Sequence, residues 1–595
     1  MSFTRLMTKN YMDKQRINVL LILGCIVIFV SSPLFSAYLY YGHDLDFHLN
    51  RIEGIKEALL AGEFPVRMQS WFFEGRGYPV SLYYGDLFLY FPALLRLLGL
   101  SVQNAYKGYL FLMNIGACGL MYFGAKGMVK DRRLAILAAL LYSLAPYRLS
   151  CLYLRAAVGE AAAMCFYPLV FYGLYCIYWG NREDKKERYG WLYLAAGFFG
   201  LIHSHIISTF IAGLFVIFFL LMNLSKTFLK ERIFDLMKAA GLTLLSSLWF
   251  LVPFAEYMQQ DIRVRNLDTK GAFASHGVFF GQLLSVFPRA NGASATVEEG
   301  LSTQYEMAFS LGGGLLLSLP LFLYCLVNLK KGKEAAERMG LQCFLLALLA
   351  LSMTLLGFPW EAIEEAGSLF EMVTKSIQYP WRFLSIATLF LVIVAALGVY
   401  RLGKTQNRMF AYSVAMAMAI LAFSSAGYYL SDYMNSFTLH KFRLIEKEDL
   451  DSASVGNGEY LPVEVEMNRL KGDLVYDNAS VWVQETAWYE QRDGIEIACT
   501  NLSEQEESLR VPKIYYRDYV AVDSITGNRL ETKKGSDGFL EVVLPPGFDG
   551  AVTVEFLSPW YWRLCEGVSL ATVSCAVVLV IVRRRKEKKD EQSQG

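Results

Sequence analysis

The sequence predicts an α-helical polytopic membrane protein with about twelve transmembrane helices and a C-terminal extracytoplasmic β-sandwich domain. Three observations predict this fold class: 54% of the 595 residues are hydrophobic, only 19% are charged, and apolar runs of membrane-spanning length recur along the chain. Soluble domains carry about a quarter charged residues, so a soluble cytoplasmic enzyme is excluded. The net charge of +1 and the lack of zinc-finger or phosphate-loop motifs argue against a nucleic-acid partner.

Twelve apolar stretches approach or reach the roughly 20 residues that a helix needs to cross the lipid bilayer. They cover residues 17–38, 104–125, 134–146, 157–179, 190–202, 206–223, 239–256, 306–327, 341–357, 381–400, 409–427 and 564–582. The stretches 134–146 and 190–202 are short, as is common for helices that line a protein-surrounded cavity. Another apolar stretch, 81–100, contains Asp86 and Arg96 and is predicted to be a juxtamembrane or re-entrant helix.

The distribution of Lys and Arg predicts the orientation. Basic clusters lie at residues 5–16, 126–133, 182–188, 226–238, 330–338, 401–408 and 583–586. Each cluster falls at an odd boundary of the span count, and Lys and Arg in short loops mark the cytoplasm. We therefore expect a multi-pass protein of the cell (plasma) membrane with both termini in the cytoplasm.

Three domains follow from this topology. Residues 1–427 form the multi-spanning membrane domain, with 39–103 as its first extracytoplasmic loop. Residues 428–561 form an extracytoplasmic β-rich domain, and 562–595 form a last transmembrane helix with a basic cytoplasmic tail.

The β-rich domain is predicted from apolar residues that alternate with polar ones. The expected strands cover residues 463–467, 481–484, 514–516, 540–544 and 552–556, and turns are expected at 545–547 and 549–550. Aromatic side chains in this domain either stack on sugars or form its core. They are Trp482, Trp488, Tyr489, Tyr515 and Tyr516.

The richest group of reactive side chains follows the first span. If Asp44 caps a helix that runs to about residue 62, then Asp44, His48 and Arg51 share one helix face. A carboxylate, an imidazole and a guanidinium could provide a general base beside a phosphate, or part of a metal site. An interfacial amphipathic helix with a good N-cap is the alternative, and Asp46 is the second choice for the base.

Further candidates lie in the next outward segments. Glu160 lies one turn into an apolar span, where an ionisable group indicates function unless it forms an ion pair with Arg148 or Arg155. His203 and His205 lie in an outward turn, where they favour phosphate or hydroxyl binding as much as zinc.

Arg382 follows aromatic residues at the outward end of a span, where it either binds a lipid-linked phosphate or snorkels to the membrane surface. Together these groups predict one reaction centre at the outer membrane interface.

The chain also resembles a known family. Its motifs include HD at residues 43–44, FH at 47–48, GEFPVR at 62–67, GRGYP at 75–79, YY at 83–84, QYPWR at 378–382, YYRDY at 515–519 and LPPG at 544–547. These motifs, with Arg155, Glu160 and His205, resemble the bacterial membrane "6-pyruvoyl-tetrahydropterin synthase-related" family. That family is similar to YfhO-like proteins and, more distantly, to the GT-C glycosyltransferase superfamily.

The resemblance implies a GT-C-like hexosyltransferase that moves a sugar from a polyprenyl-phosphate donor to a cell-envelope polymer or protein. It implies that Asp44 or Asp46 is the base or a metal ligand and that Glu160 is a second carboxylate of the site. Asp44 and Glu160 could then hold a divalent cation such as Mg or Mn.

Other groups are candidates for binding substrate or the donor phosphate. They are His48, Arg51, Arg148, Arg155, His203, His205 and Arg382. The soluble pterin enzyme that gives the family its title uses three histidines on zinc, and no such pattern occurs here.

Two other classes of function remain open. A transporter or flippase of lipid-linked glycans usually has repeated halves with broken helices at the midplane, whereas the acidic residues here gather at one face. A non-catalytic envelope assembly protein would use the β-rich domain to hold a partner.

Overall fold

The computed structural model describes residues 3–184, 187–266, 272–290, 307–328, 335–436, 441–443, 447–470, 480–489 and 493–593. The chain forms two compact units. The first comprises residues 1–45, 106–240 and 269–443, and the second comprises 46–105, 241–268 and 444–595.

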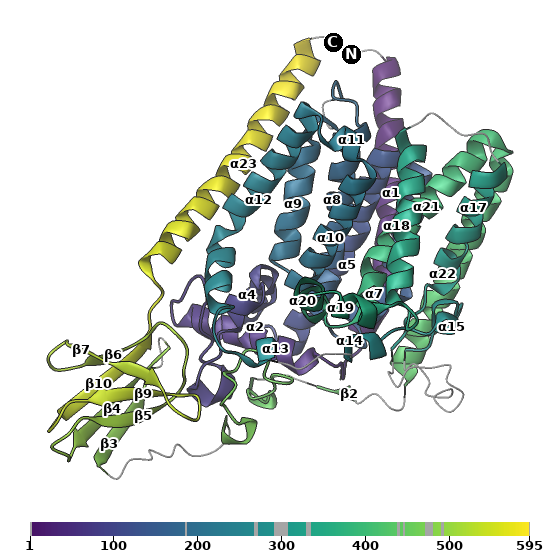
Figure 1. Ribbon diagram of the computed structural model, residues 1–595. Helices are drawn as coiled ribbons and strands as arrows, with labels where there is room; N and C mark the ends of the chain where they lie inside the picture. Colours follow the sequence, from purple (N-terminus) through teal and green to yellow (C-terminus); the bar gives the residue numbers. More distant parts are fainter. Residues whose placement is uncertain are drawn as a thin grey trace. The chain divides into compact units, whose positions relative to one another are not determined.

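The first unit is a bundle of apolar helices (Figure 1). Its helices are α1 (Phe3–Val30), α5 (Val102–Val129), α6 (Arg132–Ser143), α7 (Pro146–Leu152), α8 (Val158–Trp179), α9 (Gly190–Ile202), α10 (Ile206–Met222), α11 (Leu224–Thr227), α14 (Ala272–Ser275), α15 (Phe280–Leu283), α16 (Gly312–Leu316), α17 (Ser318–Asn328), α18 (Ala335–Thr354), α19 (Trp360–Glu365), α20 (Ser368–Ile377), α21 (Phe383–Thr405) and α22 (Arg408–Asn435). Strands β1 (Leu39–Tyr40) and β2 (Lys441–Phe442) pair antiparallel. Helix α12 (Lys230–Tyr257) belongs to both units, as does the start of α5.

Each predicted apolar stretch coincides with a helix or a helix pair, although residue 306 lies outside the described residues. In the described part of the chain, six helices are long and apolar enough to cross a membrane, and the α6–α7 pair, bent by 51°, would be a seventh. Five further apolar helices are 10–17 residues long. The total of about twelve spans and the membrane side of each helix end stay predictions.

Helix α21 is the centre of the bundle. It packs against α6, α17, α18 and α22, and 94% of its most apolar window is buried. Helices α8 and α9 pack closely because glycines line their contact: a Cβ at Gly173 would lie 2.5 Å from the backbone nitrogen of Leu194.

The second unit combines short helices with a β-sandwich. Its helices are α2 (Leu45–Leu60), α3 (Val80–Tyr83), α4 (Tyr90–Leu97), α13 (Arg263–Asn266) and the long α23 (Trp560–Ser593). The predicted stretch 81–100 consists of α3, a 3-10 turn at Leu87–Leu89 and α4, each far shorter than a span.

Two antiparallel sheets form the sandwich. The strands are β3 (Val481–Trp488), β4 (Gly494–Asn501), β5 (Glu507–Ile514), β6 (Tyr519–Asp523), β7 (Arg529–Leu530), β8 (Thr532–Lys534), β9 (Phe539–Leu544) and β10 (Asp549–Phe556). One sheet has the order β3-β4-β10-β6-β7 and the other has the order β5-β9-β8.

Three local predictions in this domain are wrong. Residues 463–467 form a turn that leads into a 3-10 helix at Met467–Leu470, because Val465 and Leu470 reach the core without a strand partner for their backbone. The expected turn at 549–550 is the start of β10, which pairs with Thr500 and Cys499. Of residues 514–516, only Ile514 lies in a strand.

The first loop and the sandwich share one hydrophobic core. Phe72, Phe73 and Tyr78 of the loop are fully buried in the same cluster as the inward-facing residues of both sheets. Backbone bonds support the contact, since the Ile514 nitrogen donates to the Arg76 carbonyl at 3.1 Å. The unit therefore joins residues 46–105 to the C-terminal domain, whereas the sequence placed 39–103 in the membrane domain. The reason for the difference is that these loop aromatics require burial.

A buried ion pair stabilises this joint. The Lys513 Nζ lies 2.6 Å from the Asp493 Oδ1 and donates to the Gly75 carbonyl at 2.8 Å, and the Tyr519 hydroxyl donates to the second Asp493 oxygen at 2.9 Å. Both charged side chains are almost fully buried. Removal of one partner would leave an unpaired charge in the core.

We expect Asp493→Ala to lower the free energy of unfolding of this unit by about 3–5 kcal/mol, because Lys513 would remain buried without its counter-ion. Thermal unfolding of the full-length protein in detergent measures the change. As a control, Glu466→Ala breaks the exposed pair with Arg469 and should change stability by less than about 1 kcal/mol. Equal effects of the two variants would contradict the interpretation.

Candidate functional site

Asp44 is held against the second outward segment by the backbone. The His43 nitrogen donates to the Leu154 carbonyl at 3.2 Å, and the Asp44 nitrogen donates to the Arg155 carbonyl at 2.9 Å. The chains approach closely at Gly42, where a Cβ would lie 2.7 Å from the Cβ of Ala156. The first loop therefore begins at a defined position on residues 154–156.

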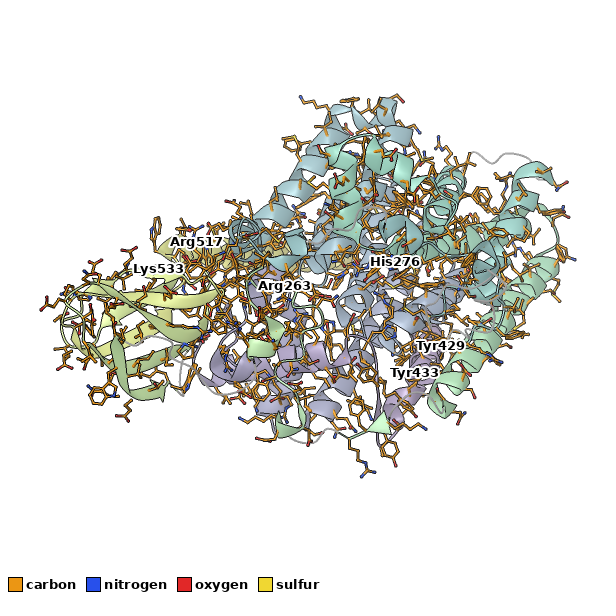
Figure 2. All side chains as sticks on the ribbon, turned by 60° about the horizontal axis from the view of Figure 1, so that its bottom comes forward. Arg263, His276, Tyr429, Tyr433, Arg517 and Lys533 are labelled. Carbon is orange, nitrogen blue, oxygen red and sulfur yellow. The ribbon has the colours of Figure 1, made fainter. Side chains whose placement is uncertain are left out.

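The second segment is also anchored to the helices. Tyr433 of α22, which lies beside Tyr429 in Figure 2, donates its hydroxyl to the Tyr153 carbonyl at 3.4 Å. The Tyr153 hydroxyl in turn donates to the Val30 carbonyl at the end of α1 at 2.5 Å.

Asp44 is half-buried, and its carboxylate lies among several charged groups. Partial burial raises its pKa above the ordinary value of 3.8, Arg155, Arg382 and His43 oppose this shift, and Glu160 adds to it. Asp44 therefore combines solvent access with two guanidinium groups nearby.

Glu160 lies in the first turn of α8 and is fully buried. The Tyr147 hydroxyl donates to its Oε1 at 2.5 Å, and Arg155 Nη1 donates to its Oε2 at 2.8 Å. Arg382 Nε lies 3.9 Å from the same Oε2. Of the two partners considered from the sequence, the structure pairs Glu160 with Arg155.

Arg382 is the cation of this group with unused hydrogen-bonding capacity. The residue is 8% exposed, and its Nε and Nη1 have no hydrogen-bond partner among the described residues. The guanidinium lies over the Tyr379 ring at 5.4 Å. The His276 ring, labelled in Figure 2, packs at 5.2 Å from Tyr379 and 5.7 Å from Trp381.

Three helices begin at this cluster. Glu160 lies at the start of α8, Arg382 directly precedes α21, and His205 is the N-cap of α10, where its Nδ1 bonds with Ser208. His205 is close enough to act electrostatically on Glu160. Because helix N-termini carry partial positive charge, they add to the attraction that the arginines exert on an anion.

Two other candidates of the first unit, Arg148 and His203, are buried among residues that they bond to or pack against. Arg148 is fully buried and donates to Asn114 at 2.8 Å and to the Ser143 carbonyl at 3.2 Å. Asn114 continues to Ser31 at 2.9 Å, so Arg148 ties together α5, α6 and the end of α1. His203 is buried in the turn after α9 and packs on Phe199 at 4.5 Å.

The predicted common face of Asp44, His48 and Arg51 is divided between the two units. The helix itself is confirmed as α2, which begins at Leu45. Arg51 donates to the Tyr84 and Gly85 carbonyls at 3.2 and 3.1 Å, and its Nη1 lies 3.4 Å from the His48 Nδ1.

Through these contacts, Arg51 and His48 hold residues 84–85 in place within the second unit. Asp46 lies near Asp451, and burial together with this second carboxylate raises the pKa of Asp46.

The sequence reasoning missed Tyr147 as a partner of Glu160. The signal was present, because Tyr147 lies within a proline-started outward segment that also carries Arg148. Tyr147 lies thirteen residues before Glu160, and Arg382 lies far later in the chain. Residue spacing alone does not predict that both meet the same carboxylate.

The donor set is poor for a metal ion. Both Glu160 oxygens are bonded to Tyr147 and Arg155, and guanidinium groups next to Asp44 disfavour a second cation. In the described part of the chain, no group of three or more His, Cys, Asp or Glu side chains could hold a metal. The Mg or Mn ion on Asp44 and Glu160 stays a prediction.

Comparison with protein families confirms the resemblance. Residues 82–292 match the model described as "6-pyruvoyl-tetrahydropterin synthase related domain; membrane protein". The match includes Arg155, Glu160 and His205 and leaves Asp44 and Arg382 outside. An uncharacterized protein of Lactococcus lactis subsp. cremoris is 23% identical over 95% of this chain and 96% of its own length.

Solved structures give a more distant likeness. The arabinofuranosyltransferase AftD from Mycobacteria superposes with a TM-score of 0.41 at 16% identity, covering 71% of this chain and 27% of its own. An Archaeoglobus fulgidus oligosaccharyltransferase complex with Zn and sulfate gives 0.42 at 13% identity, covering 69% and 53%. This chain thus spans about a quarter and about half of those chains. At these scores the likeness assigns no activity.

Proposed function

We propose that the protein is a GT-C-type glycosyltransferase of the cell membrane. It takes a sugar from a polyprenyl-phosphate donor and transfers it to a cell-envelope acceptor on the outer face, with both termini in the cytoplasm and the β domain outside. The observation that supports this most directly is the half-buried Asp44, whose carboxylate feels the charge of Arg382, and the buried Arg382 guanidinium, which keeps unused N–H groups.

Asp44 would act as the general base. Its carboxylate takes the proton from the acceptor hydroxyl while that oxygen forms a bond to the anomeric carbon of the donor sugar. The backbone bonds of His43 and Asp44 to residues 154–155 hold the base in place, so little orientation has to be gained when substrate binds.

Arg382 would stabilise the leaving group. The bond between the anomeric carbon and the phosphate oxygen breaks, and negative charge returns to the lipid phosphate. Arg382 offers free donors to that phosphate, and the starts of α8, α10 and α21 add positive potential. Glu160 and Tyr147 would act as positioning residues, because they are engaged in holding Arg155.

The first test separates Asp44 from Asp46. We expect Asp44→Asn to reduce sugar transfer by about 10²–10⁴-fold, since the base is lost while the shape is kept. Asp46→Asn is the matched control and should retain most activity, because Asp46 faces Asp451 in the other unit. Mass spectrometry of lipid-linked sugars and envelope glycans in a complemented deletion strain provides the measurement.

For these strains, equal membrane abundance of both variants is established first. A missing glycan decoration with accumulated polyprenyl-phosphate sugar in the Asp44→Asn strain supports the proposal. Full restoration of every glycan by Asp44→Asn would exclude Asp44 as the base.

The second test is the pH dependence of transfer. The base must be deprotonated, and its pKa is raised above 3.8, so activity should fall as the pH decreases through a value above that of an ordinary aspartate. The initial rate of the purified enzyme as a function of pH measures this limb. Arg382→Ala removes a positive charge that holds the Asp44 pKa down. In that variant the acidic limb of the pH–rate profile should therefore move to higher pH. A limb that stays unchanged in that variant would contradict the assignment to Asp44.

The third test addresses the donor phosphate. We expect Arg382→Ala to weaken binding of a polyprenyl monophosphate to the protein in nanodiscs by roughly tenfold or more, because a charge-assisted hydrogen bond contributes about 1.5–3 kcal/mol. Lys375→Ala removes a surface cation of α20 and is the control that should bind normally. Equal affinity of the two variants would assign Arg382 to a structural role.

A second candidate function is transport or flipping of lipid-linked glycans. The observation that favours it is the 51° break between α6 and α7, because broken helices are frequent in transporters. A flippase or a non-catalytic envelope assembly protein would not form a new glycosidic bond. Transfer of labelled sugar by the purified protein distinguishes both from the glycosyltransferase.

A further inference from the structure

The outer face of the five-stranded sheet has an unusual composition. Residues paired across strands share a face, so the register places Trp482, Thr500 and Asp549 in one row and Glu496, Thr553 and Val522 in another. The opposite face of the same strands supplies Ile495, Ile497 and Val554 to the core. The outer face is therefore distinct from the core and carries polar side chains on β3, β4 and β10.

Aromatic rings lie at two points of this surface. Trp482 is 59% exposed, an unusual exposure for a side chain whose burial normally removes 150–250 Å² from water. Tyr489 lies over Gly494, where a Cβ would be 2.6 Å from the ring. The other aromatics considered from the sequence serve the core, since Tyr516 is buried and Trp488 packs beside Lys513.

Hydrogen-bonding groups lie beside each ring. Near Trp482, Gln484 Nε2 donates to the Thr500 hydroxyl, which donates to the Asp549 Oδ1 at 2.7 Å. Near the other ring, the Tyr489 hydroxyl donates to the Glu496 Oε2 at 2.9 Å. Amide, hydroxyl and carboxylate groups of this kind both donate to and accept from a row of ligand hydroxyls.

The charge of the surface limits the ligand. On the outer face of the described strands of this sheet, carboxylates outnumber guanidinium groups, with Glu485, Glu496, Asp549 and Glu555 against Arg529. Lys533 and Lys534 belong to β8 of the other sheet (Figure 2 labels Lys533). This charge repels phosphate polymers and anionic lipid. Surface rich in Glu and Asp is also unlike the centre of a protein interface.

We propose that this face binds a neutral glycan, with sugar rings stacked on Trp482 and Tyr489 and hydroxyls bonded to the polar side chains beside each ring. The site lies in the second unit, whereas Asp44 belongs to the first, and it does not depend on transfer activity. It gives the β domain a role in holding an uncharged polysaccharide of the cell envelope.

The test is binding of the full-length protein in nanodiscs to immobilised polysaccharides. The probes are a β-glucan, a galactan and a rhamnan, with poly(glycerol phosphate) as the polyanion. We expect at least one neutral polysaccharide to bind, Trp482→Ala to weaken that binding at least tenfold, and Trp482→Tyr to lose less because a ring remains. Leu502→Ala, an exposed apolar side chain next to β4, is the matched control and should bind normally.

Three outcomes would overturn the inference: no neutral polysaccharide binds, Trp482→Ala binds as well as wild type, or poly(glycerol phosphate) binds in preference. Thermal unfolding of Trp482→Ala at the wild-type temperature excludes misfolding as the cause of a loss. Asp44→Asn should bind glycan normally, so failure of the transferase proposal and failure of this one are distinguishable.

Discussion

The first unit depends on the buried pair of Arg155 and Glu160. Two opposite charges in an apolar bundle are stable only while each keeps its partner and its remaining hydrogen bonds. Tyr147 supplies the additional bond to Glu160, at 2.5 Å. The Arg155 carbonyl also accepts from the Asp44 nitrogen, so the same residue holds both the fully buried Glu160 and the half-buried Asp44.

The two carboxylates of this site, Glu160 and Asp44, have the same chemistry but different surroundings. Glu160 has both oxygens bonded and is shielded from water, which suits a residue that positions its neighbours. Asp44 is half-buried, and burial raises its pKa against the opposing charges of Arg155 and Arg382. Arg148 and Arg382 also differ: both terminal nitrogens of Arg148 donate, to Ser143 and Asn114, whereas the Nε and Nη1 of Arg382 have no hydrogen-bond partner among the described residues. Residue type alone does not distinguish the members of either pair, whereas their partners do.

The second unit follows a different constraint. Its first-loop segment carries aromatic residues that are stable only when buried, and the inward faces of the two sheets provide that burial. The segment around Gly75 thereby reaches Lys513 and its partner Asp493 in the sandwich. Segments more than four hundred residues apart in the sequence thus form one folding unit, while the outer sheet face stays polar around Trp482.

The sequence by itself determined the helices and most of the strands. Hydrophobic runs and period-two alternation are local properties, so the twelve apolar stretches coincide with helices, and β3, β9 and β10 lie where alternation predicted them. Local signals were insufficient at residues 463–467, where apolar side chains reach the core from a turn. They were insufficient again at 549–550, where pairing with β4 overrides the turn preference of Asp and Gly.

The tertiary structure alone decided which candidate residues meet. The helical period placed Asp44, His48 and Arg51 on one face. In the structure, however, the Asp44 nitrogen donates to the Arg155 carbonyl, and Arg51 donates to the Tyr84 and Gly85 carbonyls. Arg382 reaches Glu160 from more than two hundred residues away. Contacts of this kind arise when whole helices pack and bring a buried charge next to an opposite charge. The spacing of residues along the chain does not predict them.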